Sequence, residues 1–420
     1  MTTTLEPGTR PKTTTSSMDD REKLAHLRSQ LPAVDQTGYF NAGTNGPLPQ
    51  CALDAMIDAA RRECDAGRII PGVYEGGGKR NQRIRVLLGD MLGADPSEIA
   101  LTHSTSEGNG TVLSGIDWQR GEEVVTTTLE HPGLFVPLSQ IAHRYGIRLR
   151  IIDIGDGGGD VTSTLEAAMS PRTRVVALSH VMWSSGAVAP LRDVAAMARA
   201  HHALTLVDAA QAAGQVPIDL HEMGVDAYAI PGQKWLCGPE ATGALYVRAD
   251  RMADIQPTHP RYAQTDGNGY LLPVAGANRF EIGEFFGPAI LAQEAALTWL
   301  RDEVGLDWAY SRVAALGQRC WEALAAIEGV TMASPKDKIA GLVCFQIPGM
   351  APPDIAAKLY ERGETIRYVA YPPGPAVARV STGWWNSAEE IDRLADGVRA
   401  VVADHHHGTA QAIPASGMPA

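Results

Sequence analysis

The sequence predicts an α/β protein in which a large domain, built on a mostly parallel seven-stranded sheet, precedes a smaller α+β domain. Three observations support this prediction. Seven short β-rich runs alternate with helical patterns, the pattern changes after about residue 286, and the chain of 420 residues is longer than a typical single domain. Alternation of strands and helices at this spacing is typical of a parallel sheet covered by helices.

The large domain is predicted from its β-rich runs and from one clear helix. The runs lie at 98–103, 123–130, 148–155, 173–181, 204–211, 226–233 and 243–248. Residues 190–202 show the helical period, which brings five apolar side chains to one side of the helix: Leu191, Val194, Ala195, Met197 and Ala198.

The smaller domain is predicted from longer helices and a second group of strands. The expected elements are helices at 291–305 and 312–327, and strands near 341–348, 365–372 and 376–382. A final helix is expected at 387–402, because Ser387 can cap its N-terminus and Glu390 completes a capping box.

The chain is accordingly divided into five segments. We expect a disordered tail at 1–20, a segment at 21–50 that packs on the small domain and the active site, the large domain at 51–286, the small domain at 287–404 and a second tail at 405–420. The tails are polar and hold few large apolar side chains, so they cannot bury enough surface to order alone.

Composition excludes several classes of function. There are 36 Lys and Arg residues against 48 Asp and Glu, so the net charge of −12 argues against a nucleic-acid or membrane-surface footprint. No run approaches the roughly 18 apolar residues of a membrane span, and the first residues lack an apolar signal region. The five cysteines form no C-x-x-C pair, so we expect reduced thiols, no metal site and a cytoplasmic location.

The most informative residues are Asp208, at the end of an apolar strand, and Lys234, in a turn after a later strand. Burial beside Trp235 and Leu236 would lower the pKa of the lysine amine and make it a better nucleophile toward an aldehyde. An aspartate and a lysine on neighbouring strand ends suit pyridoxal phosphate (PLP), whose ring nitrogen the aspartate keeps protonated. The alternative is a capping aspartate and a surface lysine.

Three further segments favour the same cofactor. Thr105 and Ser106 follow a strand and open a helix, where hydroxyls and backbone N–H groups can hold a phosphate, although a simple helix cap explains them as well. His131 follows another strand, where its flat ring could stack on the cofactor. Gln211 lies three residues after Asp208, so its amide could reach the phenolic oxygen of the cofactor.

Five motifs in order resemble the class V aminotransferase family, whose members are PLP enzymes of fold type I. They are S-T-S-E (104–107), E-H-P-G (130–133), S-H-V (179–181), D-A-A-Q (208–211) and G-Q-K (232–234). The family includes cysteine desulfurases, isopenicillin N epimerases and cysteine-conjugate C–S lyases, and the resemblance covers about residues 38–404.

The resemblance implies a role for each matched residue, and it implies a homodimer. By this resemblance, Lys234 forms the Schiff base, Asp208 contacts the ring nitrogen and His131 stacks on the ring of the cofactor. Gln211 binds its phenolic oxygen, and Thr105 and Ser106 bind its phosphate. Arg379 binds the α-carboxylate of the substrate. A guanidinium group suits that last role because it binds a carboxylate through two hydrogen bonds. The alternative for Arg379 is a surface charge at a strand edge.

The chain also departs from the family pattern. The stretch 366–374 lacks the nucleophilic cysteine of desulfurases, and His180 stands for an asparagine near the phenolic oxygen. Before the lysine, Pro231 and Gln233 replace the usual phosphate ligands, of which only Gln233 can donate a hydrogen bond. Glu284 stands for a threonine that the partner subunit contributes in desulfurases.

A polar turn near the N-terminus is a second candidate for substrate contact. Asn41, Thr44 and Asn45 lie in the segment 39–49 among turn-forming residues. They could bind substrate or merely satisfy the turn.

The function predicted is β-elimination from a cysteine S-conjugate, which releases a thiol, pyruvate and ammonia, in secondary or sulfur metabolism. Lys234 is the expected general base, with His131 or His180 as possible assistants. Epimerisation, transamination and decarboxylation coupled to oxidative deamination stay open as alternatives. An inactive PLP-fold scaffold that binds a partner is the non-enzymatic alternative.

Overall fold

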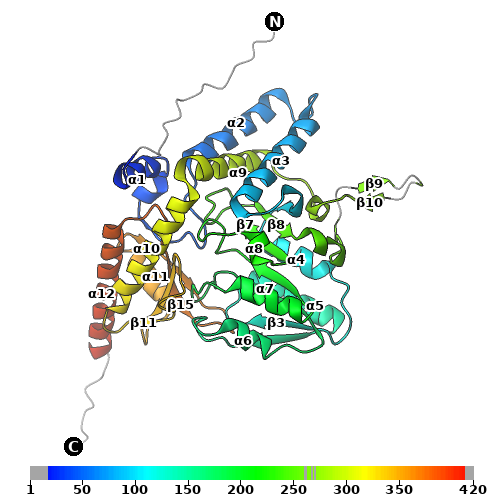
Figure 1. Ribbon diagram of the computed structural model, residues 1–420. Coiled ribbons are helices and arrows are strands. Elements are labelled where there is room, and N and C mark those ends of the chain that lie inside the picture. The colour runs from blue at the N-terminus through cyan, green and yellow to red at the C-terminus, as the bar shows by residue number, and fades with distance from the viewer. Residues whose placement is uncertain (1–17, 260–262, 266–267, 269–270, 412–420) are drawn as a thin grey trace, which may run out of the picture.

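The computed structural model describes residues 18–259, 263–265, 268 and 271–411, and its architecture is the predicted α/β one (Figure 1). A seven-stranded sheet in the order β2–β8–β7–β6–β5–β3–β4 forms the centre of the large domain. Its strands are β2 (Ile99–Thr102), β3 (Glu123–Thr127), β4 (Arg148–Ile152), β5 (Thr173–Ser179), β6 (Leu204–Asp208), β7 (Ala227–Pro231) and β8 (Gly243–Val247). Only β8 runs antiparallel to its neighbours, so the sheet is mostly parallel, and each strand lies within a predicted run.

Both faces of the central strands of this sheet are buried, which explains why these strands are rich in apolar residues, whereas the edge strand β4 is largely exposed. Successive side chains of a strand point to opposite faces. In β5, Val175 and Ala177 join one apolar cluster with α4 and α5, whereas Val176 and Leu178 join another with α6 and α7. The five apolar residues predicted to share one side of α7 are all buried.

Helices cover the two faces and one end of the sheet. They are α2 (Gln50–Ala66), α3 (Val73–Leu92), α4 (Thr105–Gly115), α5 (Pro132–Tyr145), α6 (Val161–Glu166), α7 (Leu191–Ala200), α8 (Leu220–Met223) and α9 (Gly287–Trp299). Short 3-10 turns occur at η3 (Pro96–Glu98), η4 (Ala249–Asp254) and η5 (Ala277–Phe280), and β9 (Ala263–Thr265) pairs with β10 (Leu271–Pro273). Within the described residues, no helix is long and apolar enough to cross a membrane.

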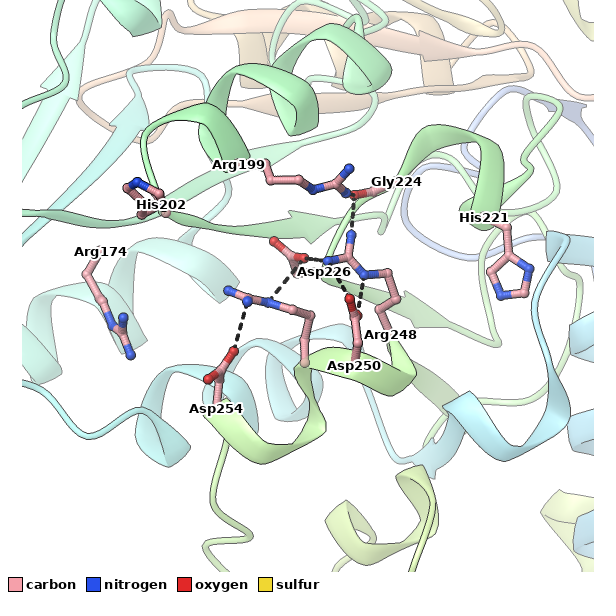
Figure 2. Close-up of a pocket in the computed structure, with 11 residues that line it drawn as sticks. Arg174, Arg199, His202, His221, Gly224, Asp226, Arg248, Asp250 and Asp254 are labelled. Carbon is pink, nitrogen blue, oxygen red and sulfur yellow. Dashed lines mark hydrogen bonds and ion pairs between the residues drawn. The ribbon is translucent and has the colours of Figure 1, made fainter.

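The two edges of the sheet differ in what they carry. The parallel strands β3, β5, β6 and β7 end at one edge, where the motif residues follow them. The opposite edge, where β5, β6 and β7 begin, is lined by arginines and aspartates around a second cavity (Figure 2).

The small domain packs three helices on an antiparallel sheet of order β11–β12–β15–β14. Its elements are α10 (Leu306–Ala325), β11 (Thr331–Met332), β12 (Leu342–Gln346), α11 (Pro352–Tyr360), β13 (Glu364–Thr365), β14 (Arg367–Val369), β15 (Val377–Ser381) and α12 (Ala388–Gln411). A π-helical turn, η6 (Leu300–Val304), joins it to α9. The predicted capping box is present, since Ser387 Oγ accepts from the Glu390 amide and Glu390 accepts from the Ser387 amide.

The chain ends differ in part from the prediction. The helix α12 continues to Gln411, past residue 405 where a tail was expected, and α10 begins at Leu306 rather than at residue 312. The remaining residues of the predicted tails, 1–17 and 412–420, lie outside the described part of the chain.

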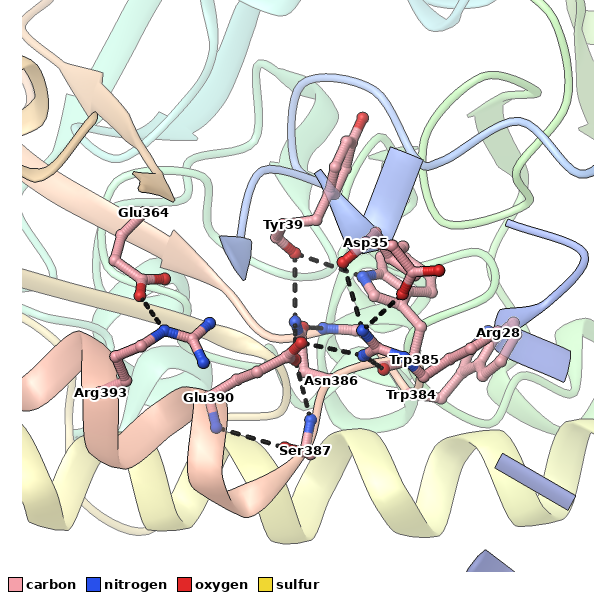
Figure 3. A network of polar contacts seen from close by, with 12 residues as sticks. Arg28, Asp35, Tyr39, Glu364, Trp384, Trp385, Asn386, Ser387, Glu390 and Arg393 are labelled. Carbon is pink, nitrogen blue, oxygen red and sulfur yellow. Dashed lines mark hydrogen bonds and ion pairs between the residues drawn. The ribbon is translucent and has the colours of Figure 1, made fainter. Parts of the chain in front are cut away.

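The N-terminal segment is attached to the small domain through polar contacts (Figure 3). It contains α1 (Asp20–Arg28), η2 (Pro32–Asp35) and β1 (Gly38–Tyr39), and β1 pairs in parallel with β13. Arg28 donates to the carbonyl of Trp385 (2.7 Å) and forms an ion pair with Glu390 (3.0 Å). The indole of Trp385 and the amide of Asn386 both donate to the carbonyl of Tyr39 (3.2 and 3.3 Å).

Replacing Arg28 with alanine should therefore destabilise the fold. The variant would leave the buried Glu390 and a carbonyl without their charged partner, so we expect a loss of about 2–3 kcal/mol in the free energy of unfolding, measured by urea denaturation. The control is Arg319→Ala, because Arg319 pairs with Asp392 on the surface (2.7 Å) and both side chains are about half exposed. Equal losses in the two variants would contradict this role of Arg28.

Candidate active site

The motif residues meet in a cavity of about 250 Å³ at the edge where the parallel strands end. Residues far apart in the sequence contribute to it because their strands are neighbours in the sheet. Its lining consists of Gly43, Thr44, Ser104, Thr105, Ser106, His131, Trp183, Asp208, Ala210, Gln211, Pro231, Gln233, Lys234, Arg367 and Arg379. Asp208 and Lys234 thus share one cavity, as the prediction of a cofactor site required.

Asp208 is a buried carboxylate at the end of β6, and donors surround it. Its Oδ2 accepts from the side-chain amide of Asn109 (2.9 Å), and its Oδ1 accepts from the backbone N–H of Ala210 (2.9 Å). Burial raises the pKa of Asp208, while these hydrogen bonds and the charge of Lys234 act in the opposite direction. The sequence analysis did not identify Asn109, which lies on α4 one turn beyond the predicted phosphate residues.

Lys234 lies in a tight turn whose backbone is closed by hydrogen bonds. The N–H of Cys237 donates to the Lys234 carbonyl (3.0 Å), and the N–H of Gly238 donates to the carbonyl of Gly232 (2.9 Å). Burial lowers the pKa of Lys234 to about 8, with Asp208 opposing this shift and Arg379 adding to it. Near neutral pH a substantial fraction of the amine is therefore unprotonated and nucleophilic.

Gln211 and Trp235 hold the lysine turn against the N-terminal segment. The amide of Gln211 donates to the carbonyl of Gly43 (2.9 Å), and its oxygen accepts from the indole N–H of Trp235 (3.1 Å). The N–H of Gly46 donates to the carbonyl of Gln233 (2.8 Å). These bonds place the segment around Gly43 directly over the site.

His131 lies across the cavity as the N-cap of α5. Its Nδ1 accepts from the N–H of Gly133 (2.8 Å), and its ring meets the indole of Trp183 edge to face, with centroids 4.5 Å apart. Burial, with the charges of Lys234 and Arg379, lowers the pKa of His131 to about 3. The ring is therefore neutral and carries its proton on Nε2, so it offers a flat face but no free basic nitrogen.

Glu130 explains why the E-H-P-G and S-H-V motifs occur together. Its two carboxylate oxygens accept from the hydroxyls of Thr127 (2.7 Å) and Ser179 (2.6 Å), which joins the ends of β3 and β5. Burial raises the pKa of Glu130 to about 7. This contact fixes the strand end from which His131 extends.

The start of α4 carries a hydroxyl donor with no partner among the described residues. Ser104 caps the helix by accepting from the Glu107 amide (3.1 Å). The hydroxyl of Thr105 and the side-chain oxygen of Gln233 are both buried without a hydrogen-bond partner. An unsatisfied hydroxyl donor at a helix N-terminus, such as that of Thr105, forms a suitable site for a phosphate, whereas the Gln233 oxygen is an acceptor and does not add to it.

Two arginines of the small domain face the same cavity from neighbouring strands. Arg379 on β15 is buried and donates to the carbonyl of Trp183 (3.3 Å), and Arg367 on β14 is its cross-strand partner. Burial lowers the pKa of Arg379 to about 10, so the group stays charged at neutral pH. A Cβ on Gly43 would lie 2.8 Å from Arg379 Nη2, so only glycine allows this close approach.

Four residues singled out in the sequence do not line the cavity: His180, Glu284, Asn41 and Asn45. His180 is buried, and its Nδ1 bonds to the hydroxyl of Tyr228 (2.7 Å) instead of facing a cofactor. Trp183, three residues later, occupies the cavity instead, so the assignment of His180 to the cofactor is corrected. Glu284 is exposed and does not line the cavity either.

The two asparagines of the N-terminal turn serve the turn and not the cavity. Asn41 accepts from the hydroxyl of Thr44 (2.8 Å), and the amide of Asn45 donates to Glu240 (2.8 Å). Gly43 and Thr44, between them, are the residues that reach the cavity. Trp183, Arg367 and Gly43 also line the cavity, and the sequence analysis did not identify them. Nothing in the sequence alone distinguishes these three residues from ordinary residues of loops and strand ends.

The described residues form no group that could bind a metal ion, and they place no cysteine thiol in the cavity. Among the described residues, no group of three or more His, Cys, Asp or Glu side chains could hold a metal ion. All five cysteines are within the described part of the chain and unpaired, and none lines the cavity.

Comparisons with known proteins agree with this geometry. The family model for class V aminotransferases matches residues 39–394. A probable cysteine desulfurase 2 of Mycobacterium leprae is 30% identical over 89% of this chain and 96% of its own length, and the isopenicillin N epimerase of Streptomyces clavuligerus is 28% identical over 87% and 95%. The structure of the cystine C–S lyase C-DES with cysteine persulfide superposes with a TM-score of 0.83 at 29% identity, covering 88% of this chain and 99% of that one.

The fold and the cavity define a PLP enzyme of fold type I, since a C-DES mutant that superposes with a TM-score of 0.84 carries glycine covalently linked to that cofactor. The chain belongs to the class V aminotransferase family. Its own residues fit the cofactor: the unpartnered hydroxyl of Thr105, at the N-terminus of α4, suits the phosphate, Asp208 suits the ring nitrogen, and Lys234 suits the aldehyde.

The protonation of Lys234 can be tested on the apoenzyme. A short pulse of reductive methylation modifies only the neutral amine, so modification of Lys234 should rise with pH and be half-maximal near pH 8. In Asp208→Asn the midpoint should move to lower pH, because the carboxylate charge that raises the lysine pKa is lost. Peptide mass spectrometry measures both, with the exposed Lys338 as the internal control whose profile should not change. An upward shift would contradict the arrangement.

The contact between Asn109 and Asp208 can be tested by Asn109→Leu, which removes the donor and keeps the volume. Loss of a hydrogen bond to a buried charge costs about 1.5–3 kcal/mol, so we expect at least about tenfold weaker cofactor retention on dialysis and slower turnover. Thr111→Val on the same helix is the control, because Thr111 is buried but does not line the cavity. Equal retention in the two variants would exclude a specific role for Asn109.

Proposed function

We propose that this protein is a PLP-dependent lyase that cleaves the C–S bond of a cysteine S-conjugate by β-elimination. The overall reaction converts R–S–CH₂–CH(NH₃⁺)–COO⁻ and water into R–SH, pyruvate and ammonium. When bound, pyridoxal phosphate supplies the electron sink that stabilises negative charge at the substrate Cα. The bond that breaks is then decided by how the protein orients the substrate and where it places a base.

Three residues would perform the protein's part of the reaction. Arg379 can bind the substrate α-carboxylate through its guanidinium group, whose position is set by the Trp183 carbonyl and by Gly43. Lys234, with its lowered pKa, would be the base that takes the proton from Cα. The electron pair left at Cα would then expel the thiolate from Cβ.

The observation that carries this proposal is that no thiol lines the cavity. A desulfurase needs a thiolate to accept the sulfur atom, whereas a lyase leaves the sulfur on the departing group. Cys344, on β12 opposite Arg379, is fully buried, and burial raises its pKa to about 12. The similarity to C-DES, described as a cystine C–S lyase, supports the same choice.

The geometry favours elimination over epimerisation. Epimerisation needs a second base on the face of the substrate opposite Lys234. His131 is the only imidazole that lines the described cavity, and its Nδ1 already accepts a backbone hydrogen bond. His180 is held by Tyr228 outside the cavity.

Groups near the mouth of the cavity would select the sulfur substituent. Arg367 is exposed on β14 and lies over the ring of Tyr368, with no carboxylate partner among the described residues. Trp183 and the exposed Tyr371 lie with ring centroids 6.2 Å apart. We therefore propose that the substituent is planar or anionic, because these side chains offer aromatic faces and one unpaired positive charge.

We also propose a homodimer in the cytoplasm. Apolar side chains on α2 and α3 and in the loop between them are exposed, which favours burial against a second subunit; they are Leu53, Ile57, Ile69, Ile70, Val73 and Val86. Five unpaired cysteines are typical of a reducing compartment.

The decisive experiment is product analysis with the purified holoenzyme. Incubation with L-cystine and with aryl and carboxyalkyl cysteine conjugates should yield pyruvate and ammonium in equal amounts, detected by coupled lactate dehydrogenase assay and mass spectrometry. Lys234→Ala should abolish both products, and Arg379→Lys should raise KM by at least about tenfold because the two-point contact is lost. Absence of pyruvate across the panel would refute the proposal.

The product from L-cysteine separates lyase from desulfurase. Sulfur transfer to a protein thiol would give alanine and a persulfide, whereas elimination gives pyruvate. We expect pyruvate, and we expect Cys344→Ala to leave its rate unchanged. Alanine formation that disappears in Cys344→Ala would instead identify a desulfurase.

A further inference from the structure

A cavity of about 620 Å³ lies on the edge of the sheet opposite the active site (Figure 2). Arg174 is at the start of β5 and Asp226 directly precedes β7, whereas Asp208 and Lys234 follow the far ends of β6 and β7. Arg248 reaches the same edge because β8 is antiparallel. Strands of five residues separate the two cavities by roughly 17 Å.

Two arginines of this cavity form ion pairs with its three aspartates. Arg248 pairs with Asp226 (3.0 Å) and Asp250 (2.6 Å), and Arg251 pairs with Asp254 (3.2 Å). The carboxylate of Asp226 also accepts from the backbone N–H of Thr205 (2.8 Å). These contacts hold the wall of the cavity together, and with Arg174 and Arg199 the cavity has four arginines against three aspartates.

Two further arginines lack a carboxylate partner among the described residues. Arg199 uses Nη2 to donate to the carbonyl of Gly224 (2.7 Å) and forms no ion pair there. Arg174 has no hydrogen bond or ion pair to any described residue, and its Nε is buried without a partner. In Figure 2 no dashed line reaches Arg174 or His202, whose side chains lie on the same side of the cavity.

A buried donor without a partner is costly, so an arginine in this state indicates a missing acceptor. The chain as a whole is strongly acidic, yet this cavity presents unpaired guanidinium groups. An acidic protein does not need additional arginines to remain in solution, so solubility does not explain why arginines gather at this cavity.

We propose that this cavity is an accessory anion site that takes a small molecule bearing a phosphate or pyrophosphate group. The guanidinium fork matches two phosphate oxygens, and the volume lies in the range of small-molecule sites. An acidic peptide is a poorer occupant, because a cavity of about 620 Å³ has the size of a small-molecule site and not of an extended peptide groove.

The test uses pyrophosphate and the PLP-loaded enzyme, so that the active-site phosphate position is already filled. Isothermal titration should give one site per chain. Arg174→Gln should weaken the affinity for pyrophosphate by about tenfold or more, as expected for loss of a charged hydrogen bond. The affinity of Arg174→Lys should lie between those of the unmodified protein and Arg174→Gln, because lysine keeps the charge but not the two-point contact of a guanidinium group.

The matched control is Arg148→Gln, since Arg148 is an exposed arginine at the start of β4 on the same edge of the sheet and outside the cavity. The affinity of Arg148→Gln for pyrophosphate should equal that of the unmodified protein. Each variant must keep its visible cofactor absorbance and its melting temperature without pyrophosphate. No binding, equal binding by all variants, or equal weakening by Arg148→Gln would overturn the proposal.

Discussion

The buried carboxylate of Asp208 is the constraint on which the site depends. A charge at the end of a central strand, with apolar residues on both faces of the sheet, is stable only if donors and a positive charge surround it. Asn109, the Ala210 amide and Lys234 provide them from three different elements. The same electrostatic arrangement keeps the lysine amine near the balance between its charged and neutral forms.

The N-terminal segment completes what the sheet begins. Gly43 and Gly46 allow the backbone to pass close to Arg379 and to the lysine turn, where a side chain would collide. The segment is held from the other side by the contacts of Arg28 and Tyr39 with the small domain. The substrate arginine and the cofactor lysine, which lie in different domains, are thereby brought to one cavity.

Much of the large domain was predictable because both faces of its sheet are buried. Apolar runs such as 175–178 cannot remain in water, so all seven strands could be located before the structure was known. Short pairings such as β1 with β13 were not predictable, because two residues carry no periodicity and their partner lies more than 300 residues away. The same limit applies to α12, whose last turns continue through histidines that suggested a tail.

The sequence alone determined the chemical types at the site, since an aspartate, a lysine and a helix-opening Thr-Ser pair at strand ends are recognisable from their order and spacing. Only the tertiary structure decided which neighbours complete them. It selected Trp183 over His180, placed Asn109 behind Asp208, turned Asn41 and Asn45 away, and brought Arg367 beside Arg379. The reason is physical: strand order and side-chain direction depend on long-range packing, which a local pattern does not contain.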